Sequence, residues 1–218
     1  IETYIFASTC SVYGSQPDVL ITEKSPLKPL DFYAEQKFKC ERAIGWLNRA
    51  PTIMRFGTLF GLSPRMRFDL VINTFIAQAI KKGKIQVFGG NQYRPFLNVE
   101  DAADSLIFAL EKNLTGIYNV VSENLTISEA SQRIKKLSGC EIEVLSQNED
   151  KRNYKVSGDK LKQIGFTPSQ TIESSYQKIK NAFDTGLFDD YSNPKYNNYK
   201  LLFSSKEMQE RVFMLGLE

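Results

Sequence analysis

The sequence of 218 residues contains no histidine, and this absence excludes several kinds of active site. A histidine general base, a Ser-His-Asp triad and a histidine-ligated metal cannot form in this chain. Acid–base chemistry must therefore come from Tyr, Lys, Asp, Glu, Cys or a bound cofactor. We predict no metal site.

Cysteine, net charge and long apolar runs are also scarce. Cys10, Cys40 and Cys140 are odd in number and lack the spacing of a metal site or a disulfide framework, which suits a reducing cytoplasm. The net charge of +3 is too small to indicate a nucleic-acid partner. Without a run of 18 apolar residues, we predict no membrane partner.

Strand and helix patterns alternate along the chain and predict an α/β fold. Residues 3–7 form a β-branched and aromatic run typical of a strand, 32–48 have helical apolar spacing, and 52–56 indicate another strand. Strand, helix and strand in this order form a βαβ unit with a parallel sheet. Further helices are predicted at 69–82, 100–112, 126–137, 157–164, 172–182 and 205–215, strands at 85–88, 94–99, 117–121 and 142–145, and loops at 14–30 and 189–199.

Tyr33 and Lys37 carry the strongest chemical signal. Four residues apart on a helix, the phenol and the ammonium share one face. A nearby Lys⁺ lowers the pKa of a tyrosine by favouring the phenolate, which can then remove a proton from a hydroxyl group or return it. The spacing alone is weak evidence. Three other pairs match it, namely Tyr176–Lys180, Tyr191–Lys195 and Tyr196–Lys200.

The segments around Tyr33 add the context that the other pairs lack. The first strand ends in Phe6-Ala-Ser-Thr-Cys-Ser-Val-Tyr-Gly14, so small hydroxyl side chains lie at a carboxyl end, where open α/β sheets bind ligands. Arg55-Phe-Gly-Thr-Leu-Phe-Gly61 follows, and later Val87-Phe-Gly-Gly-Asn-Gln-Tyr-Arg-Pro-Phe-Leu-Asn-Val-Glu-Asp101. In this order the segments resemble the extended short-chain dehydrogenase/reductase family of nucleotide-sugar epimerases, dehydratases and ketoreductases. The resemblance covers residues 1 to about 185.

The resemblance implies a partial Rossmann-like doubly wound parallel sheet, its C-terminal part, together with a smaller α/β substrate-binding domain. Residues 1–62 would form the C-terminal part of the NAD-binding domain and carry the catalytic Thr, Tyr and Lys. Residues 63–188 would form mainly the nucleotide-sugar-binding domain, with segments near 94–121 returning to the first domain. Residues 189–218 would be a C-terminal tail.

The resemblance also implies a catalytic set and a cofactor. Thr9 has the place of the family's hydroxyl residue that bonds to the sugar oxygen, Tyr33 that of the acid–base residue, and Lys37 that of the lysine that holds the nicotinamide ribose. The cofactor would be NAD or NADP. Its implied contacts are Ser8, Tyr33, Lys37, Phe56, Gly57 and Thr58, although many family members carry Asn at the position of Thr58.

A nucleotide-diphosphate sugar is the implied substrate. Arg94 and Arg152 would bind its diphosphate, for which a guanidinium fork has suitable geometry. Asn73 would contact the phosphates, Phe88 would lie against the base, and Ser11 would assist at the sugar. An exposed surface arginine is the alternative for Arg152, and a core aromatic is the alternative for Phe88. Arg65 and Arg67 are either further substrate contacts or parts of a solvated loop.

Two departures from the family narrow the chemistry. Cys10 and Ser11 stand where 4,6-dehydratases carry Asp-Glu, and the absence of histidine excludes the Cys–His pair of 3,5-epimerases. A sugar 4-epimerase and a 4-ketoreductase remain, and the sequence does not separate them. The alternatives are a non-catalytic nucleotide-binding member of the fold and an unrelated interaction module. A homodimer is also implied, through the Tyr–Lys helix with Phe38 and Trp46.

No G-x-x-G-x-x-G segment follows a strand in this sequence, so we expect an N-terminally truncated chain that binds NAD(H) poorly. We predict that the 218-residue chain alone shows no oxidoreductase activity, whereas the complete gene product does. Turnover of a nucleotide sugar with NAD by the chain alone would contradict this expectation.

Overall fold

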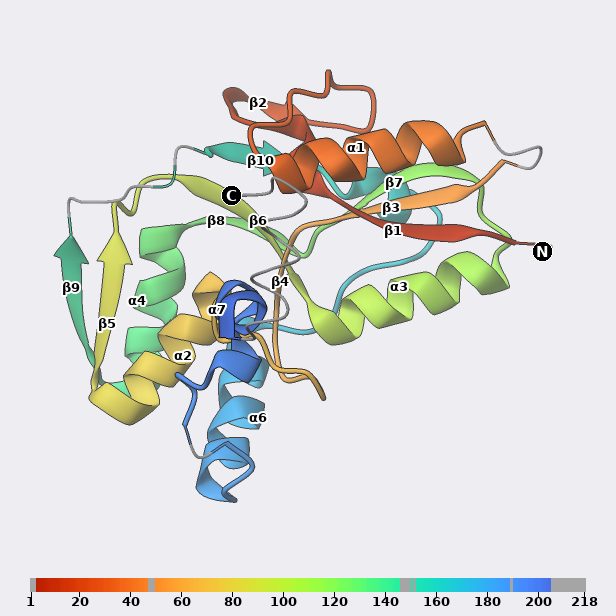
Figure 1. Cartoon of the computed structure of the whole chain (residues 1–218). Coiled ribbons are helices and arrows are strands. Elements are labelled where there is room, and N and C mark those ends of the chain that lie inside the picture. The colour runs from red at the N-terminus through yellow and green to blue at the C-terminus, as the bar shows by residue number, and fades with distance from the viewer. Residues whose placement is uncertain (1–2, 47–49, 146–149, 151, 189, 205–218) are drawn as a thin grey trace.

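The structure is a computed structural model that describes residues 3–46, 50–145, 150, 152–188 and 190–204. The predicted α/β fold is confirmed, since helices alternate with strands in mainly parallel sheets (Figure 1). The helix predicted at 205–215 lies outside the described residues. Within the described part of the chain, no helix is long and apolar enough to cross a membrane.

A three-stranded parallel sheet supports the beginning of the chain. Its order is β1 (Ile5–Thr9), β3 (Thr52–Phe56) and β7 (Gly116–Val120). Helix α1 (Phe32–Ile44) covers one face and α3 (Val99–Glu111) the other, as Figure 1 shows. Because all three strands run in the same direction, their carboxyl ends meet at one edge.

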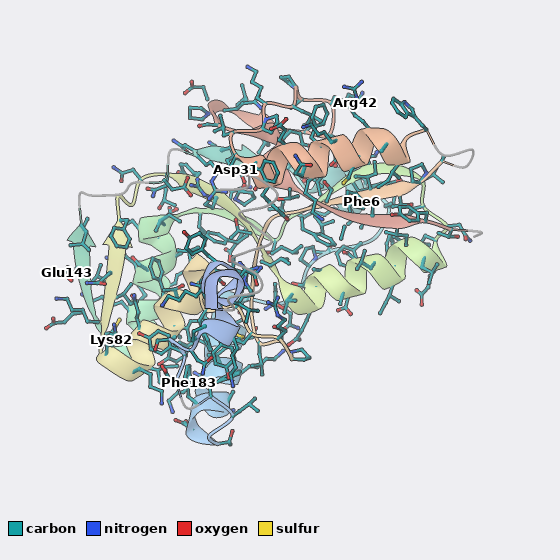
Figure 2. All side chains as sticks on the ribbon, in the orientation of Figure 1. Phe6, Asp31, Arg42, Lys82, Glu143 and Phe183 are labelled. Carbon is teal, nitrogen blue, oxygen red and sulfur yellow. The ribbon has the colours of Figure 1, made fainter. Side chains whose placement is uncertain are left out.

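A second group of elements surrounds the largest hydrophobic cluster. Helices α2 (Val71–Lys82), α4 (Ile127–Ser138) and α6 (Ile172–Asp184) pack together there, and β5 (Lys84–Phe88) pairs in parallel with β9 (Glu141–Leu145). Side chains of this cluster, including Phe183 on α6, fill the space between the helices (Figure 2). The helix start predicted at Thr126 is confirmed, because Thr126 and Glu129 form a capping box.

Several short elements were not predicted from the sequence patterns. The expected loop at 14–30 contains β2 (Gln16–Ile21), and the expected loop at 189–199 contains a 3₁₀ turn, η2 (Pro194–Tyr196), and the start of α7 (Asn198–Ser204). Strand β2 is mostly exposed and contains Pro17, so only its pairing with a distant strand identifies it. The remaining elements are η1 (Cys10–Tyr13), β4 (Thr58–Phe60), β6 (Tyr93–Asn98), β8 (Glu123–Thr126), β10 (Tyr154–Val156) and α5 (Asp159–Gln163).

A buried polar network ties α1 to the sheet. Arg55, 2% exposed in the central strand β3, donates to both carboxylate oxygens of Glu41 on α1 at 3.0 and 2.6 Å. The same guanidinium donates to the Tyr13 hydroxyl at 2.8 Å, and Tyr13 donates to Asn119 at 2.7 Å. Ser8 donates to Glu41 at 2.5 Å. The network therefore joins β1, η1, α1, β3 and β7.

Replacing one partner of the Arg55–Glu41 ion pair should destabilise the fold strongly. We predict that Arg55→Met lowers the free energy of unfolding by about 3–5 kcal/mol, because it leaves the Glu41 carboxylate buried without a counter-charge. Urea unfolding of the chain measures the change. Lys39→Met is the matched control, since Lys39 forms an exposed ion pair with Glu35 and its loss should cost about 0.5 kcal/mol or less. Equal losses in the two variants would contradict the prediction.

Candidate functional site

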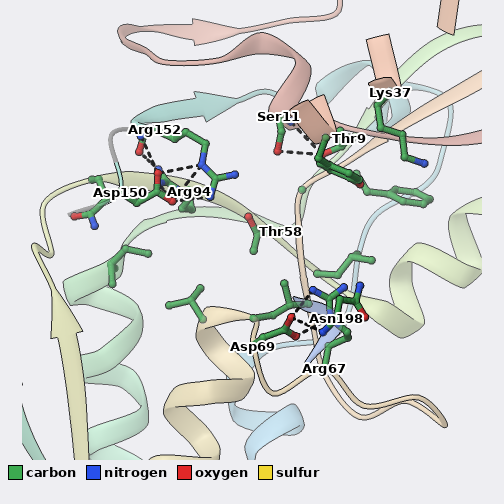
Figure 3. A pocket seen from close by; sticks show the side chains of 18 of the residues that line it. Thr9, Ser11, Lys37, Thr58, Arg67, Asp69, Arg94, Asp150, Arg152 and Asn198 are labelled. Atoms are coloured by element: carbon green, nitrogen blue, oxygen red, sulfur yellow. Dashed lines mark hydrogen bonds and ion pairs between the residues drawn. The ribbon is translucent and has the colours of Figure 1, made fainter. Parts of the chain in front are cut away.

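A cavity of about 730 Å³ opens at the carboxyl ends of β1 and β3. Every predicted site residue except Asn73 lines it. The lining residues from the prediction are Ser8, Thr9, Ser11, Tyr33, Lys37, Phe56, Gly57, Thr58, Phe88, Arg94 and Arg152. Figure 3 shows Thr9, Ser11 and Lys37 on one side of the cavity and Arg94 with Arg152 on another. The structure thus brings together residues from widely separated parts of the chain.

Thr9 is placed by the turn that follows β1. It caps the short helix η1, where its Oγ1 accepts a hydrogen bond from the Ser11 amide at 3.1 Å. The hydroxyl also donates to the Ser11 hydroxyl at 3.2 Å. These bonds hold two hydroxyl groups side by side at the cavity wall.

Tyr33 and Lys37 lie on the first turns of α1, which Asp31 caps by accepting from the Ala34 amide at 2.8 Å. The Lys37 ammonium donates to the carbonyl of Ala7 at 2.9 Å. It lies 6.0 Å from the centroid of the Tyr33 ring. Lys37 is therefore attached to β1 and reaches Tyr33 only at the limit of a cation–π contact.

The electrostatic setting of Tyr33 differs from our expectation. Although 56% of Tyr33 is exposed, burial of the rest raises the pKa of its phenol. A hydrogen bond with Thr9 and the charge of Arg67 oppose this shift. The expected lowering of the pKa by Lys37 is not found in this structure, because burial raises the pKa and the opposing contributions come from Thr9 and Arg67.

The arginine end of the cavity is organised around Asp150. Arg152 donates to this carboxylate at 2.6 and 3.0 Å, and Nη2 of Arg94 lies 2.7 Å from its Oδ2. Burial alone would raise the pKa of Asp150, but its hydrogen bonds from Arg152 and its ion pair with Arg94 hold the pKa well below the ordinary value. The Asp150 carboxylate is therefore an ionised counter-charge between the two guanidinium groups.

Arg94 has an unusual hydrogen-bonding state. It is 5% exposed, and its Nη1 donates to the carbonyls of Tyr93, at 2.8 Å, and Arg152. Its Nη2 is close to Asp150 but not aligned with it, and it makes no hydrogen bond within the described part of the chain. A buried donor without a partner is costly, so this atom favours an anionic or carbonyl oxygen from a ligand.

Phe88 and Gly57 reach the cavity for different reasons. Phe88 is 41% exposed and lines the cavity, so the core alternative for this aromatic ring is wrong. At Gly57 a Cβ atom would lie 2.9 Å from the carbonyl oxygen of Pro95. Glycine at this position is therefore explained by the close packing of β6 against the end of β3, whatever the cavity binds.

Asn73 is the predicted residue that the structure keeps away from the cavity. It is 2% exposed on α2, where its Oδ1 accepts from the Gly61 amide at 2.9 Å and its Nδ2 donates to the Arg67 carbonyl at 3.0 Å. Its amide therefore holds the loop before α2. Contact with phosphates stays a prediction that this geometry does not support.

Several residues that line the cavity were not predicted from the sequence. Asp69 and Asp150 are acidic partners of arginines, and Asn198 comes from the segment expected to be a tail. An Arg-x-Asp or Asp-x-Arg spacing indicates a local ion pair, but no pattern could place Asn198. Within the described part of the chain, no group of Cys, Asp and Glu is placed to hold a metal ion.

Comparison with known proteins identifies the family. The model of the NAD dependent epimerase/dehydratase family matches residues 1–121. A UDP-glucose 4-epimerase of Lactobacillus helveticus is 27% identical over 169 residues, which cover 65% of this chain and 50% of that protein. An uncharacterised UDP-glucose epimerase of Bacillus subtilis is 28% identical over 201 residues, 88% of this chain and 59% of that protein. The chain thus spans about half the length of these relatives.

Solved structures support the same fold. The UDP-N-acetylglucosamine 4-epimerase of Methanobrevibacter ruminantium, in complex with UDP-N-acetylmuramic acid, aligns with a TM-score of 0.75 and 24% identity. The alignment covers 85% of this chain and 64% of that one. This likeness confirms the Rossmann-like fold, and the family match covers more than half of the 218 residues. The chain therefore belongs to the NAD dependent epimerase/dehydratase family, an extended short-chain dehydrogenase/reductase family.

Proposed function

We propose that this chain carries the catalytic and substrate-binding part of a nucleotide-sugar 4-epimerase or 4-ketoreductase. The observation that carries the proposal is that a single cavity joins Thr9, Tyr33 and Lys37 to the arginines Arg94 and Arg152. Its volume of about 730 Å³ suits a drug-sized or cofactor-sized ligand. UDP is the favoured nucleotide, because the relatives named above are UDP-sugar enzymes.

The residues present fit one end of a nicotinamide cofactor. Ser8 and Thr9 stand at the carboxyl end of the parallel strand β1, where Rossmann-like sheets bind dinucleotides, and Lys37 reaches this end from α1. Three described strands run directly into helices, at Thr9, Asn98 and Thr126, and none of them does so through a glycine-rich turn. The chain would therefore hold the nicotinamide ribose through Lys37, and NAD or NADP would supply the hydride chemistry when bound.

Tyr33 would handle the proton of the redox step. With its pKa raised, it is a neutral phenol near pH 7, the form that can donate a proton to a sugar keto oxygen during reduction. In the oxidative direction the phenolate would accept the proton of the sugar hydroxyl. Thr9, which lines the same cavity, would hold the same sugar oxygen and orient it.

Arg94 and Arg152 would bind the diphosphate. Phosphate oxygens accept bidentate hydrogen bonds from guanidinium groups, and Arg94 Nη2 has a buried hydrogen available. Asp150 now lies between the two side chains, so binding would exchange its carboxylate contacts for phosphate contacts. Arg152 also lies 3.5 Å from Asp31, which caps α1, and this contact links the diphosphate end to the helix of Tyr33.

The outer face of α1 supports a homodimer as part of this proposal. Leu30, Phe32 and Trp46 are 57%, 61% and 80% exposed along or beside this helix. Phe38 instead packs partly against a buried cluster, so Trp46 is the better candidate for a partner contact. A reducing cytoplasm remains the proposed location, and the three thiols, Cys10, Cys40 and Cys140, are free in the structure.

Removing the phenol should abolish turnover. We predict that Tyr33→Phe, in a form of the protein that turns over a UDP-sugar, lowers kcat by about 100-fold or more, because positioned acid–base groups contribute about 10²–10⁴-fold. Steady-state turnover of a UDP-sugar with NAD measures the effect. Tyr176→Phe is the matched control, since Tyr176 shares the spacing to Lys180 but belongs to the hydrophobic core. Unchanged turnover in Tyr33→Phe would favour a non-catalytic nucleotide-binding protein.

The arginine end makes a separate prediction for the 218-residue chain itself. We predict that Arg152→Gln raises the Kd for UDP about tenfold, since a charge-assisted hydrogen bond contributes about 1.5–3 kcal/mol. Isothermal titration calorimetry measures the affinity. Arg133→Gln is the control, because Arg133 pairs with Glu123 and Glu173 and does not line the cavity. A similar change in the two variants would count against a diphosphate site at Arg152.

A further inference from the structure

A third polar group in the cavity takes no part in the roles assigned above. Arg67, Asp69 and Asn198 line the cavity away from both the Thr9 side and the arginine end, as Figure 3 shows. We call these three residues the polar wall. Arg67 donates to Asp69 through Nε at 2.6 Å and through Nη2 at 2.8 Å. The two side chains thus form a planar, bidentate ion pair.

The C-terminal segment holds the polar wall in place. The backbone amide of Asn198 donates to Asp69 Oδ2 at 3.2 Å, and Asn198 Oδ1 accepts from Arg65 at 2.9 Å. Beside it, the Phe68 amide donates to the carbonyl of Tyr196 at 3.0 Å. The polar wall is therefore completed by the C-terminal segment, which was predicted to be a tail.

An aromatic cluster fixes that segment. The Phe68 ring, which is 5% exposed, has four aromatic neighbours with ring centroids 5.3 to 5.9 Å away. They are Phe183 on α6 and Phe188, Tyr191 and Tyr196 on the segment after it. Because Phe68 stands between Arg67 and Asp69 in the sequence, this packing sets the position of both charged groups. The wall is a built part of the cavity, with its ion pair only 31% and 16% exposed.

The charges of the polar wall indicate which ligand group it can accept. Arg67 and Asp69 cancel each other, so the pair offers no net attraction to an anion. Its carboxylate oxygens and remaining guanidinium hydrogens can instead accept from and donate to neutral hydroxyl groups. Burial alone would raise the pKa of Asp69, but the bonds from Arg67 and Asn198 lower it, so this carboxylate is ionised at neutral pH. A ligand carboxylate at the wall would therefore find the charge of Arg67 already neutralised and would lie close to the negative oxygens of Asp69.

We propose that the polar wall binds the hydroxyl groups of a neutral hexose and excludes uronates, with Asp69 as the specificity-determining residue. The inference rests on the proposed nucleotide-sugar function and deepens it, because it names the sugar class. Arg67 supplies donors to the hexose, Asp69 supplies acceptors and keeps Arg67 neutralised, and the C-terminal segment holds both. Without the charge of Asp69, Arg67 becomes a free cation in the cavity that can bind a sugar carboxylate.

Calorimetric titration of the 218-residue chain with UDP, UDP-glucose and UDP-glucuronate tests the proposal. The wild-type chain should bind UDP-glucose about tenfold more tightly than UDP-glucuronate. Asp69→Asn should weaken binding of UDP-glucose, strengthen binding of UDP-glucuronate about tenfold, and leave the Kd for UDP unchanged. Glu123→Gln is the matched control, because it removes a carboxylate from another arginine pair that lies outside the cavity.

Asn198→Pro tests the contribution of the C-terminal segment. Proline has no backbone N–H, so this variant removes the donor to Asp69. Asn198 is the first residue of α7, and Asn197 before it is extended at φ −135° and ψ 117°, so proline fits the backbone at this position. Binding of UDP-glucose should weaken about threefold, with UDP binding unchanged.

The outcomes separate the two proposals. If the wild-type chain does not bind UDP, the proposed nucleotide-sugar function fails, and the sugar preference fails with it. If the wild-type chain binds UDP but shows no preference for UDP-glucose, only the role of the polar wall is overturned. The role of the polar wall is also overturned if thermal denaturation shows that Asp69→Asn is folded and the variant keeps the wild-type ratio of the affinities for UDP-glucose and UDP-glucuronate.

Discussion

The buried ion pair between Arg55 and Glu41 is the constraint on which the site depends. Every residue of β3 is buried, so the guanidinium of Arg55 requires a counter-charge, and α1 supplies it through Glu41. This fixes the rotation of α1 about its axis and its distance from the sheet. Tyr33 and Lys37 lie on the same helix, and Ser8, which bonds to Glu41, precedes Thr9. The ion pair that stabilises the fold therefore also sets the positions of Thr9, Tyr33 and Lys37.

Much of the fold and about half of the residues that line the cavity could be predicted, because the sequence signals for them are local. Thr9 follows a strand end and Tyr33 follows a helix cap, so each position can be counted from an element boundary. The approach of Lys37 to the Ala7 carbonyl depends on how α1 lies on β1, which no local pattern records. Strand β2 and the cavity position of Asn198 depend on pairing between distant segments, so the sequence could not reveal them.

The cavity is formed by segments that lie far apart in the sequence. The side with Thr9, Tyr33 and Lys37 comes from β1 and α1. The arginine end comes from β6 and the segment before β10, and the polar wall comes from the loop before α2 and the C-terminal segment. Each group contains an internal hydrogen bond or ion pair that fixes side chains before a ligand arrives, which reduces the ordering cost of binding. Asn73 is buried and polar, but its side chain bonds to the backbone of Gly61 and Arg67 and so supports the loop that carries the polar wall.

The hydrogen bonds of Arg67 and Arg94 differ, and this difference favours one orientation of a bound ligand in the cavity. At the polar wall Arg67 is paired in plane with Asp69, whereas Arg94 retains a buried Nη2 hydrogen without an aligned acceptor. An anion gains most where a buried donor lacks a partner, because binding there removes an existing cost. In the proposed complex the diphosphate would therefore bind at Arg94, and the sugar beyond it would extend towards Tyr33 and the polar wall. Without that asymmetry the cavity could accept a nucleotide sugar in either orientation, and only one of them brings a sugar hydroxyl to the phenol.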